Sequence, residues 1–194
     1  MSEVRQQIER RLGDALALHQ ALLAHSEAIA AVAEVLVSAY GRGAKAIFFG
    51  NGGSAADAQH LAAELVGRYY HERRALPALA LSVNTSSVTA IGNDYGYEAI
   101  FARQIEAFGT KGDVAIGIST SGRSPNVLAA VRVAKAQGLV TVGLTGQHGG
   151  PLGDEVDHLI AVPSTDTPRI QEAHILIGHL WCEAIERSVS GDRA

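Results

Sequence analysis

A cluster of hydroxyl side chains is the first feature of this sequence that could do chemistry. Ser119, Thr120, Ser121 and Ser124 fall between the apolar run DVAIGI and the segment VLAAVRVAKAQG, which has a helical period. Ser124-Pro125 is typical of a helix N-cap followed by proline at the first helical position. The free N–H groups of a helix start, with hydroxyl donors beside them, favour an anion. The turn therefore predicts a phosphate-monoester site, although an ordinary serine-rich cap is the alternative.

A second turn, GNGGSAAD at residues 50–57, is rich in glycine. It matches the G-x-G-x-x-A pattern of dinucleotide-binding loops, but such sites need an acidic residue at the end of the next strand. The next apolar run ends in LSVNTSS, which has no acid. We therefore expect no nucleotide cofactor, and place Asn51, Gly52, Gly53 and Ser54 at a helix start that faces the same crevice as the serine turn.

A histidine and a carboxylate lie four residues apart in the helix predicted at 54–68. His60 and Glu64 therefore share one face of that helix. Such a pair can bind a metal ion, or work as an acid and a base. The alternative is an ordinary surface His–Glu pair.

The last predicted helix, 168–189, carries Gln171, His174 and His179 in an otherwise apolar stretch. Gln171 and His179 differ by about 80° around the helix and by about 12 Å along it. They could reach one ligand only from opposite ends, unless one belongs to a neighbouring chain, and a core histidine is the alternative for either imidazole. The apolar residues cover most faces of the helix, so we expect other subunits to bury them; they are Ile175, Leu176, Ile177, Leu180, Trp181 and Ile185.

These groups together suggest proton transfer on a phosphorylated sugar. A carboxylate or imidazole can take a proton from a carbon next to a carbonyl, and donors or a cation can stabilise the enediolate that forms. Zn²⁺ held by His60, Glu64, Gln171 and His179 would be a Lewis acid at that oxygen. Glutamine is an uncommon zinc ligand, so the sequence favours the isomerisation more strongly than the metal.

Composition limits the class of protein. The chain has 194 residues, of which 47% are apolar and 19% charged, as in one globular domain with a real core. The net charge of −4 and the lack of a basic stripe argue against nucleic acid as a partner. The single cysteine, Cys182, and a charged N-terminal segment without signal-peptide character favour the cytoplasm. No apolar run is expected to approach the ~18 residues of a membrane span.

Short apolar runs alternate with helical patterns along the chain. This alternation predicts a parallel sheet covered on both faces, in one α/β domain with an N-terminal helical arm that breaks before Ser26. Ligands bind outside the carboxyl ends of such strands, where the unusual turns lie. The predicted strands are 46–50, 78–83, 113–119, 141–146 and 158–163, and the predicted helices of the core are 54–68, 86–92, 97–108, 125–137 and 168–189.

Several of these motifs, in this order, resemble the sugar isomerase (SIS) domain proteins, and among them most closely the bacterial phosphoheptose isomerases. The resemblance covers almost the whole chain and is weakest over residues 1–40. It rests on GNGGSAADAQHLAAELVGRY, AIGNDYGY, GDVAIGISTSGRSPNV, LTGQHGG and VPSTDTPRIQEAHILIGH.

The resemblance implies a three-layer, flavodoxin-like fold with a five-stranded parallel sheet, as a single SIS domain over 1–194 with an arm (1–40) and an α/β core (41–194). It implies a homotetramer with active sites between chains, and conversion of sedoheptulose 7-phosphate to D-glycero-D-manno-heptose 7-phosphate for lipopolysaccharide or other glycans. The implied catalytic pair is Glu64 and His179, and the implied zinc ligands are His60, Glu64, Gln171 and His179. The implied substrate contacts are Asn51, Gly52, Gly53, Glu64, Asn93, Asp94, Ser119, Thr120, Ser121, Ser124 and Gln171.

Two other functions use the same fold. A non-enzymatic SIS tetramer that binds the replication initiator is expected to lack the acid and the histidine at the positions of Glu64 and His179, and both are present here. A sugar-phosphate-sensing module would keep the serine turn without needing His60, Glu64 or His179. The enzyme is therefore the favoured function.

Overall fold

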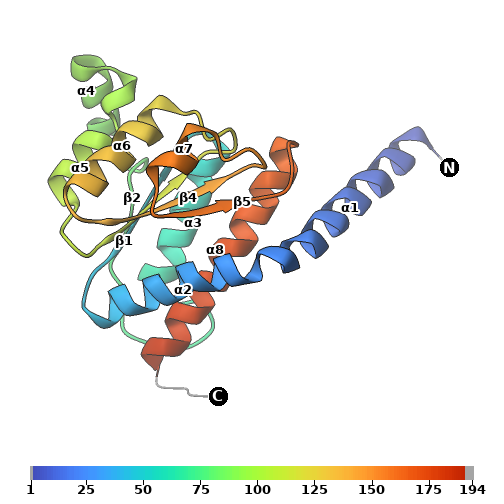
Figure 1. Cartoon of the computed structure of the whole chain (residues 1–194), viewed down its shortest axis with the longest axis horizontal. Coiled ribbons are helices and arrows are strands. Elements are labelled where there is room, and N and C mark those ends of the chain that lie inside the picture. The colour runs from blue at the N-terminus through green and yellow to red at the C-terminus, as the bar shows by residue number, and fades with distance from the viewer. Residues whose placement is uncertain (1, 191–194) are drawn as a thin grey trace.

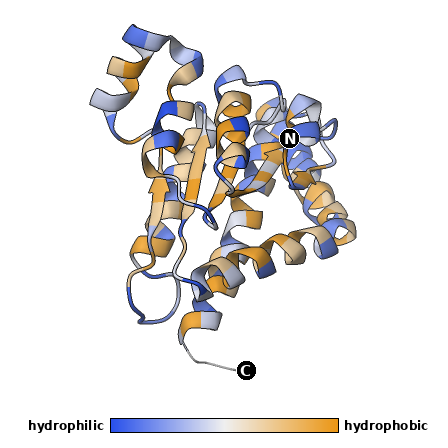
Figure 2. Cartoon of the chain, turned by 60° about the vertical axis from the view of Figure 1, so that its left-hand side comes forward, coloured by the Kyte–Doolittle hydropathy of each residue, from blue (hydrophilic) through white to orange (hydrophobic). Residues whose placement is uncertain are grey.

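Five parallel strands form one sheet in the order β2-β1-β3-β4-β5 in the computed structural model, which describes residues 2–190. The strands are hydrophobic along their length (Figure 2), and β1, β3 and most of β4 are completely buried. The predicted five-stranded parallel sheet is thus confirmed, although β2 ends three residues earlier than expected because the chain turns after Ala80. The strands are β1 Ala46–Gly50, β2 Ala78–Ala80, β3 Val114–Ile118, β4 Val140–Thr145 and β5 His158–Ala161.

Helices cover both faces of this sheet, which gives the predicted three layers (Figure 1). On one face lie α2 (Ser26–Gly41), α3 (Gly53–Val66) and α8 (Thr167–Ser190). On the other lie α5 (Ala102–Phe108), α6 (Pro125–Ala136) and α7 (Gly150–Glu155). The sequence did not predict α7, because its six residues include two glycines and a proline.

Alternating side chains of the strands build two cores. In β1, Phe48 packs with α2, α3 and α8, whereas Ile47 and Phe49 pack with α5 and α6. The predicted helix 97–108 is a short 3-10 turn, Tyr97–Ala99, followed by α5. A further helix, α4 (Thr85–Tyr95), has no buried residue and projects from the body (Figure 1).

The N-terminal arm is helical, as predicted, and breaks where expected. A 3-10 turn, Leu22–His25, separates α1 (Glu3–Ala21) from α2. Most of α1 extends away from the body (Figure 1), and its apolar side chains are exposed, with Leu12 at 60% and Leu16 at 71%. The stretch Glu3–Gly41 is long and apolar enough to cross a membrane by length and composition alone. The expectation that no apolar run approaches that size is therefore wrong, although α2 packs on α8 as a core helix does.

The last helix is buried mainly by its own chain. Ile177, Trp181 and Ile185 belong to the core shared with α2 and α3, and the indole N–H of Trp181 donates to the carbonyl of Ile29 at 3.1 Å. Only Leu180, 45% exposed, is a large apolar residue of α8 that faces solvent among the described residues. The expectation that other subunits bury this helix is thus wrong for most of its surface.

His174 on α8 makes stability depend on pH. Its side chain is fully buried, its Nε2 pairs with the carbonyl oxygen of Thr145 at 3.1 Å, and burial lowers its pKa to about 4. The unfolded chain takes up the proton near pH 6.5, whereas the folded chain resists it. Folding stability should therefore fall as the pH drops from about 6.5 towards 4, by on the order of 3 kcal/mol from this group.

We predict that His174→Gln removes this part of the pH dependence. Urea unfolding of both proteins between pH 7 and pH 4.5 measures it. An equally steep loss of stability in the variant and the wild type would contradict this assignment.

Candidate active site

The site lies where the strand order reverses. In the order β2-β1-β3-β4-β5 the chain leaves β1 and β3 in opposite directions along the sheet, which opens a crevice between their carboxyl ends. Asn51 follows β1, and Asn126 lies in the first turn of α6, after β3. Their side-chain amides exchange two hydrogen bonds, of 2.9 and 2.8 Å, and the hydroxyl of Tyr97 donates to Asn51 Oδ1 at 3.1 Å. This amide pair fixes the two loops against each other.

The serine turn lies at this crevice, with Ser119 buried and Ser121 exposed. Ser124 is the N-cap of α6, as predicted, but its side chain does not cap the helix. Instead its Oγ hydrogen-bonds Ser119 Oγ at 2.9 Å. Pro125 has no N–H group and those of Val127 and Leu128 donate to the Ser124 carbonyl, so in the first turn of α6 the N–H of Asn126 is the one left for another acceptor, such as an anion, among the described residues.

Gly122 allows the turn to pack closely. Its φ is +64°, and a Cβ there would lie 1.9 Å from the carbonyl oxygen of Gly149. Beside the turn is a hollow of about 230 Å³, which Thr120 and Ser121 line. The sequence did not predict the other polar residues that line this hollow. Arg123 could have been found, because it is a cation inside the predicted anion-binding turn. The others are Gln147, His148, Ser164, Thr165 and Thr167.

Gln171 lies against the glycine turn. A Cβ on Gly53 would fall 2.2 Å from Gln171 Nε2, so the amide occupies the space that glycine leaves. This place suits the predicted contact with substrate. Within one chain it does not suit the predicted zinc ligation, because Gln171 lies about 12 Å along α8 from His179.

Three predicted metal ligands do converge. His60 Nε2 lies 3.0 Å from His179 Nε2 and 3.2 Å from Glu64 Oε1, and one ligand atom from each of the three residues lies within 4.8 Å of the others. The two histidines come from the same chain, so a neighbouring chain is not needed to bring His179 to α3. We call His60, Glu64 and His179 the triad.

The electrostatics of the triad favour a neutral imidazole. Burial lowers the pKa of His179, and His60 lowers it further, whereas the Glu64 carboxylate opposes the shift. His179 therefore keeps a lone pair at neutral pH. Nearby on α3, burial raises the pKa of Asp57 to about 6, against the opposing effect of His60, and its Oδ2 has no partner among the described residues.

The donor set fits zinc. Two imidazoles and a carboxylate are a common zinc-binding set. Two nitrogens on one tetrahedral zinc ion lie about 3.3 Å apart, given Zn–N bonds of about 2.05 Å. The 3.0 Å between the two Nε2 atoms is close to that spacing. Two facing ring nitrogens of neutral histidines can share one proton at most, whereas a cation accepts both lone pairs.

Asn93 and Asp94 lie apart from the other site residues. Both are exposed near the end of α4. Within residues 2–190 their side chains hydrogen-bond only to each other, at 2.8 Å. One chain therefore forms the serine turn and the triad but does not bring the α4 residues to either.

Comparison with known proteins agrees with this arrangement. The family model for the SIS domain matches residues 14–146. The phosphoheptose isomerase of Burkholderia pseudomallei is 50% identical over 187 residues, which cover 95% of each chain. That of Nitratiruptor sp. is 62% identical over 144 residues, which cover 74% of this chain and 77% of the relative.

A solved structure shows the same fold over nearly the full length of this chain. A phosphoheptose isomerase from Francisella tularensis superposes with a TM-score of 0.92 at 35% identity, covering 96% of this chain and all of that one. The resemblance seen in the motifs is thus confirmed over nearly the whole sequence. The chain belongs to the phosphoheptose isomerase family of SIS domain proteins.

Proposed function

We propose that this protein interconverts sedoheptulose 7-phosphate and D-glycero-D-manno-heptose 7-phosphate. Membership of the family supports the reaction. The observation that carries it is the convergence of His60, Glu64 and His179, since binding alone would need no such group. The serine turn, with its hydroxyls, the N-terminus of α6 and Arg123, would hold the phosphate.

The triad supplies what an aldose–ketose isomerisation needs. Glu64 takes a proton from C1 of the ketose, which gives an enediolate, and returns it to C2. His179, neutral at pH 7, moves the proton of the C1 hydroxyl to the oxygen on C2. The products of these transfers are an aldehyde at C1 and a hydroxyl at C2. Both residues lie on rigid helices, which keeps the proton-transfer distances short.

A zinc ion would be held by His60, Glu64 and His179, and when bound it supplies Lewis-acid stabilisation of negative charge on substrate oxygen. Both residues have a second atom for the second role: Glu64 can ligate with one carboxylate oxygen and exchange a proton with the other, and His179 can ligate with one ring nitrogen and take part in proton transfer through the other. Gln171 remains a proposed fourth ligand only if it comes from another copy of the chain.

We infer that the active site is completed between chains of a homotetramer, and that residues 1–194 act as one SIS domain. The SIS family model matches residues 14–146, but the triad also includes His179 on α8, so the site needs residues beyond that match. Within one chain Gln171, Asn93 and Asp94 lie away from the triad. The projecting α4 and the exposed apolar side chains of α1 would face other copies. The enzyme would work in the cytoplasm, in heptose supply for lipopolysaccharide or other glycans.

Glu64→Gln tests the chemistry. The amide keeps the shape of the side chain but cannot act as a base, so kcat should fall by about two to four orders of magnitude, while KM for sedoheptulose 7-phosphate changes little. Formation of the aldose phosphate is the measurement. Glu72→Gln makes the same change at an exposed residue of the following segment and should leave the rate unchanged. Turnover near wild type in Glu64→Gln would overturn the assignment and point to Asp57 or His179 as the base.

Zinc binding by the triad has its own test. Metal-free protein titrated with Zn²⁺ against a chromogenic chelator should bind one ion per chain. Loss of a residue that hydrogen-bonds a metal ligand typically lowers metal affinity about 10- to 100-fold. His60→Ala removes a ligand itself, so it should lower the affinity for Zn²⁺ by at least that factor. The matched variant His25→Ala, on the arm, should bind as wild type does. Equal affinity in all three proteins would exclude the triad as the metal site.

A charged substitution on α1 tests whether the N-terminal arm holds the tetramer together. Leu16→Glu places a carboxylate among the exposed apolar side chains of α1 and should convert the tetramer to smaller species. Gln7→Glu adds the same charge about 180° around the helix and should not. Light scattering gives the mass, to be compared with 20.3 kDa for one chain. A monomeric wild type at working concentration would refute the tetramer.

A further inference from the structure

A buried ion pair lies beside the triad and has no part in the chemistry described above. Arg73 follows α3 in an irregular segment, and Glu186 lies near the end of α8. Both side chains are 1% exposed, and Arg73 Nε donates to Glu186 Oε1 at 3.1 Å. Buried pairs of this kind often add little net stability compared with apolar packing, so a role other than stability is to be sought for this one.

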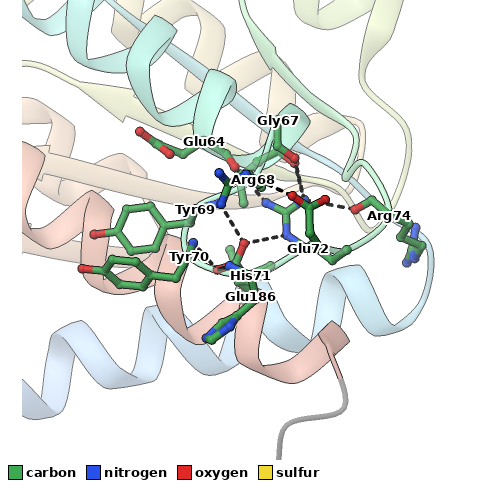
Figure 3. Close-up of polar contacts among 12 residues, drawn as sticks. Glu64, Gly67, Arg68, Tyr69, Tyr70, His71, Glu72, Arg74 and Glu186 are labelled. Carbon is green, nitrogen blue, oxygen red and sulfur yellow. Dashed lines mark hydrogen bonds and ion pairs between the residues drawn. The ribbon is translucent and has the colours of Figure 1, made fainter.

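Glu186 holds the start of the segment after α3 (Figure 3). Its two carboxylate oxygens accept hydrogen bonds from three consecutive backbone N–H groups, those of Tyr69, Tyr70 and His71, at 2.8, 2.6 and 2.9 Å. Burial raises the pKa of Glu186, but these three donors and Arg73 lower it by more. Glu186 is therefore a carboxylate throughout the neutral pH range.

Arg73 holds the end of α3. Its Nη2 donates to the carbonyl of Glu64 at 2.8 Å, and its Nη1 donates to the carbonyl of Leu65 at 2.9 Å and to that of Gly67 at 3.2 Å. These carbonyls have no partner within a helix that ends at Val66, and a cation there also suits the helix dipole. One of them belongs to the triad residue Glu64.

The segment that Glu186 holds also touches the triad. The ring of Tyr69 lies 5.7 Å from that of His179 and 4.3 Å from that of Tyr70, measured between centroids. Glu186 and His179 are seven residues apart on α8, which places them on the same side of that helix, two turns apart. The ion pair thus joins α3 to α8 on the side where the triad forms.

We propose that Arg73 and Glu186 are positioning residues for the triad: they set the angle between Glu64 and His179 through the carbonyl of Glu64 and the ring of Tyr69. This inference rests on the proposed function for its rate readout. The two residues touch neither the substrate nor the metal ion. Their effect is to keep the triad in the geometry that proton transfer and metal binding require.

Glu186→Gln tests the proposal. The amide keeps the size of the side chain, but it replaces one of the two oxygens that accept hydrogen bonds from the backbone N–H groups by an NH₂ group, which donates. Asp113→Asn is the matched control. Asp113 is also a buried carboxylate, 4% exposed, that accepts from the backbone N–H groups of Lys45 and Thr110 and pairs with Lys45 Nζ, but it joins the residues that precede β1 and β3 and does not join α3 to α8. Both variants should lower Tm.

Only Glu186→Gln should alter the site. We expect kcat and the affinity of metal-free protein for Zn²⁺ each to fall about 10- to 100-fold, with KM for sedoheptulose 7-phosphate within about twofold of wild type. In Asp113→Asn both quantities should stay at wild-type values. Equal losses in the two variants, or no loss in Glu186→Gln, would overturn the proposal.

Two further measurements cover the other outcomes. Tyr69→Leu leaves the ion pair whole and removes the ring beside His179, so it should lower kcat and zinc affinity even if Glu186→Gln does not fold; unchanged values would overturn the proposal.

If the wild type itself has no isomerase activity, the proposed function fails. Crystal structures of the variants then test the positioning role separately from the rate. The triad should be displaced in Glu186→Gln and intact in Asp113→Asn. An undisplaced triad in Glu186→Gln would overturn the proposal.

Discussion

The close packing of α3 on α8 is the contact on which the site depends. A Cβ on Gly178 would lie 2.4 Å from Leu61, so the two helices touch where α8 has no side chain. The helices run in the same direction, since Gly53 meets Gln171 near their starts and His60 meets His179 about two turns later. A bulkier residue at Gly178 would displace the Leu61 side chain, and one at Gly53 would displace the Gln171 amide. One helix–helix register therefore places both the amide at the glycine turn and the triad.

Local patterns in the sequence predicted most of the fold. The five apolar runs became the five strands, because a strand covered on both faces must be apolar on successive residues. Ser124-Pro125 marked the start of α6, and the four-residue spacing of His60 and Glu64 marked their common face. What the sequence could not predict depends on residues far apart in the chain. The pairs Asn51–Asn126 and Arg73–Glu186 carry no local signal, since each side chain alone resembles an ordinary polar residue of a turn or helix.

The last helix shows how one pattern can have two causes. Apolar residues on most faces of α8 suggested contacts between subunits, but α2, α3 and the sheet of the same chain cover them. An amphipathic pattern distinguishes buried from exposed faces and does not say which chain buries them. The exposed apolar side chains of α1 are a stronger sign of a partner, because the described residues of this chain leave them uncovered.

Binding and chemistry are built from different elements. The serine turn depends on β3, the start of α6 and the close approach of Gly149, whereas the triad depends on α3 and α8. Backbone N–H groups and hydroxyls suffice to hold a phosphate, and they tolerate small shifts because each contributes modestly. Proton transfer needs heavy atoms within hydrogen-bond distance of one particular carbon or oxygen, and so cannot tolerate such shifts. This difference in tolerance explains why the phosphate site can lie in a turn while the triad lies on two packed helices, with an ion pair buried where those helices meet.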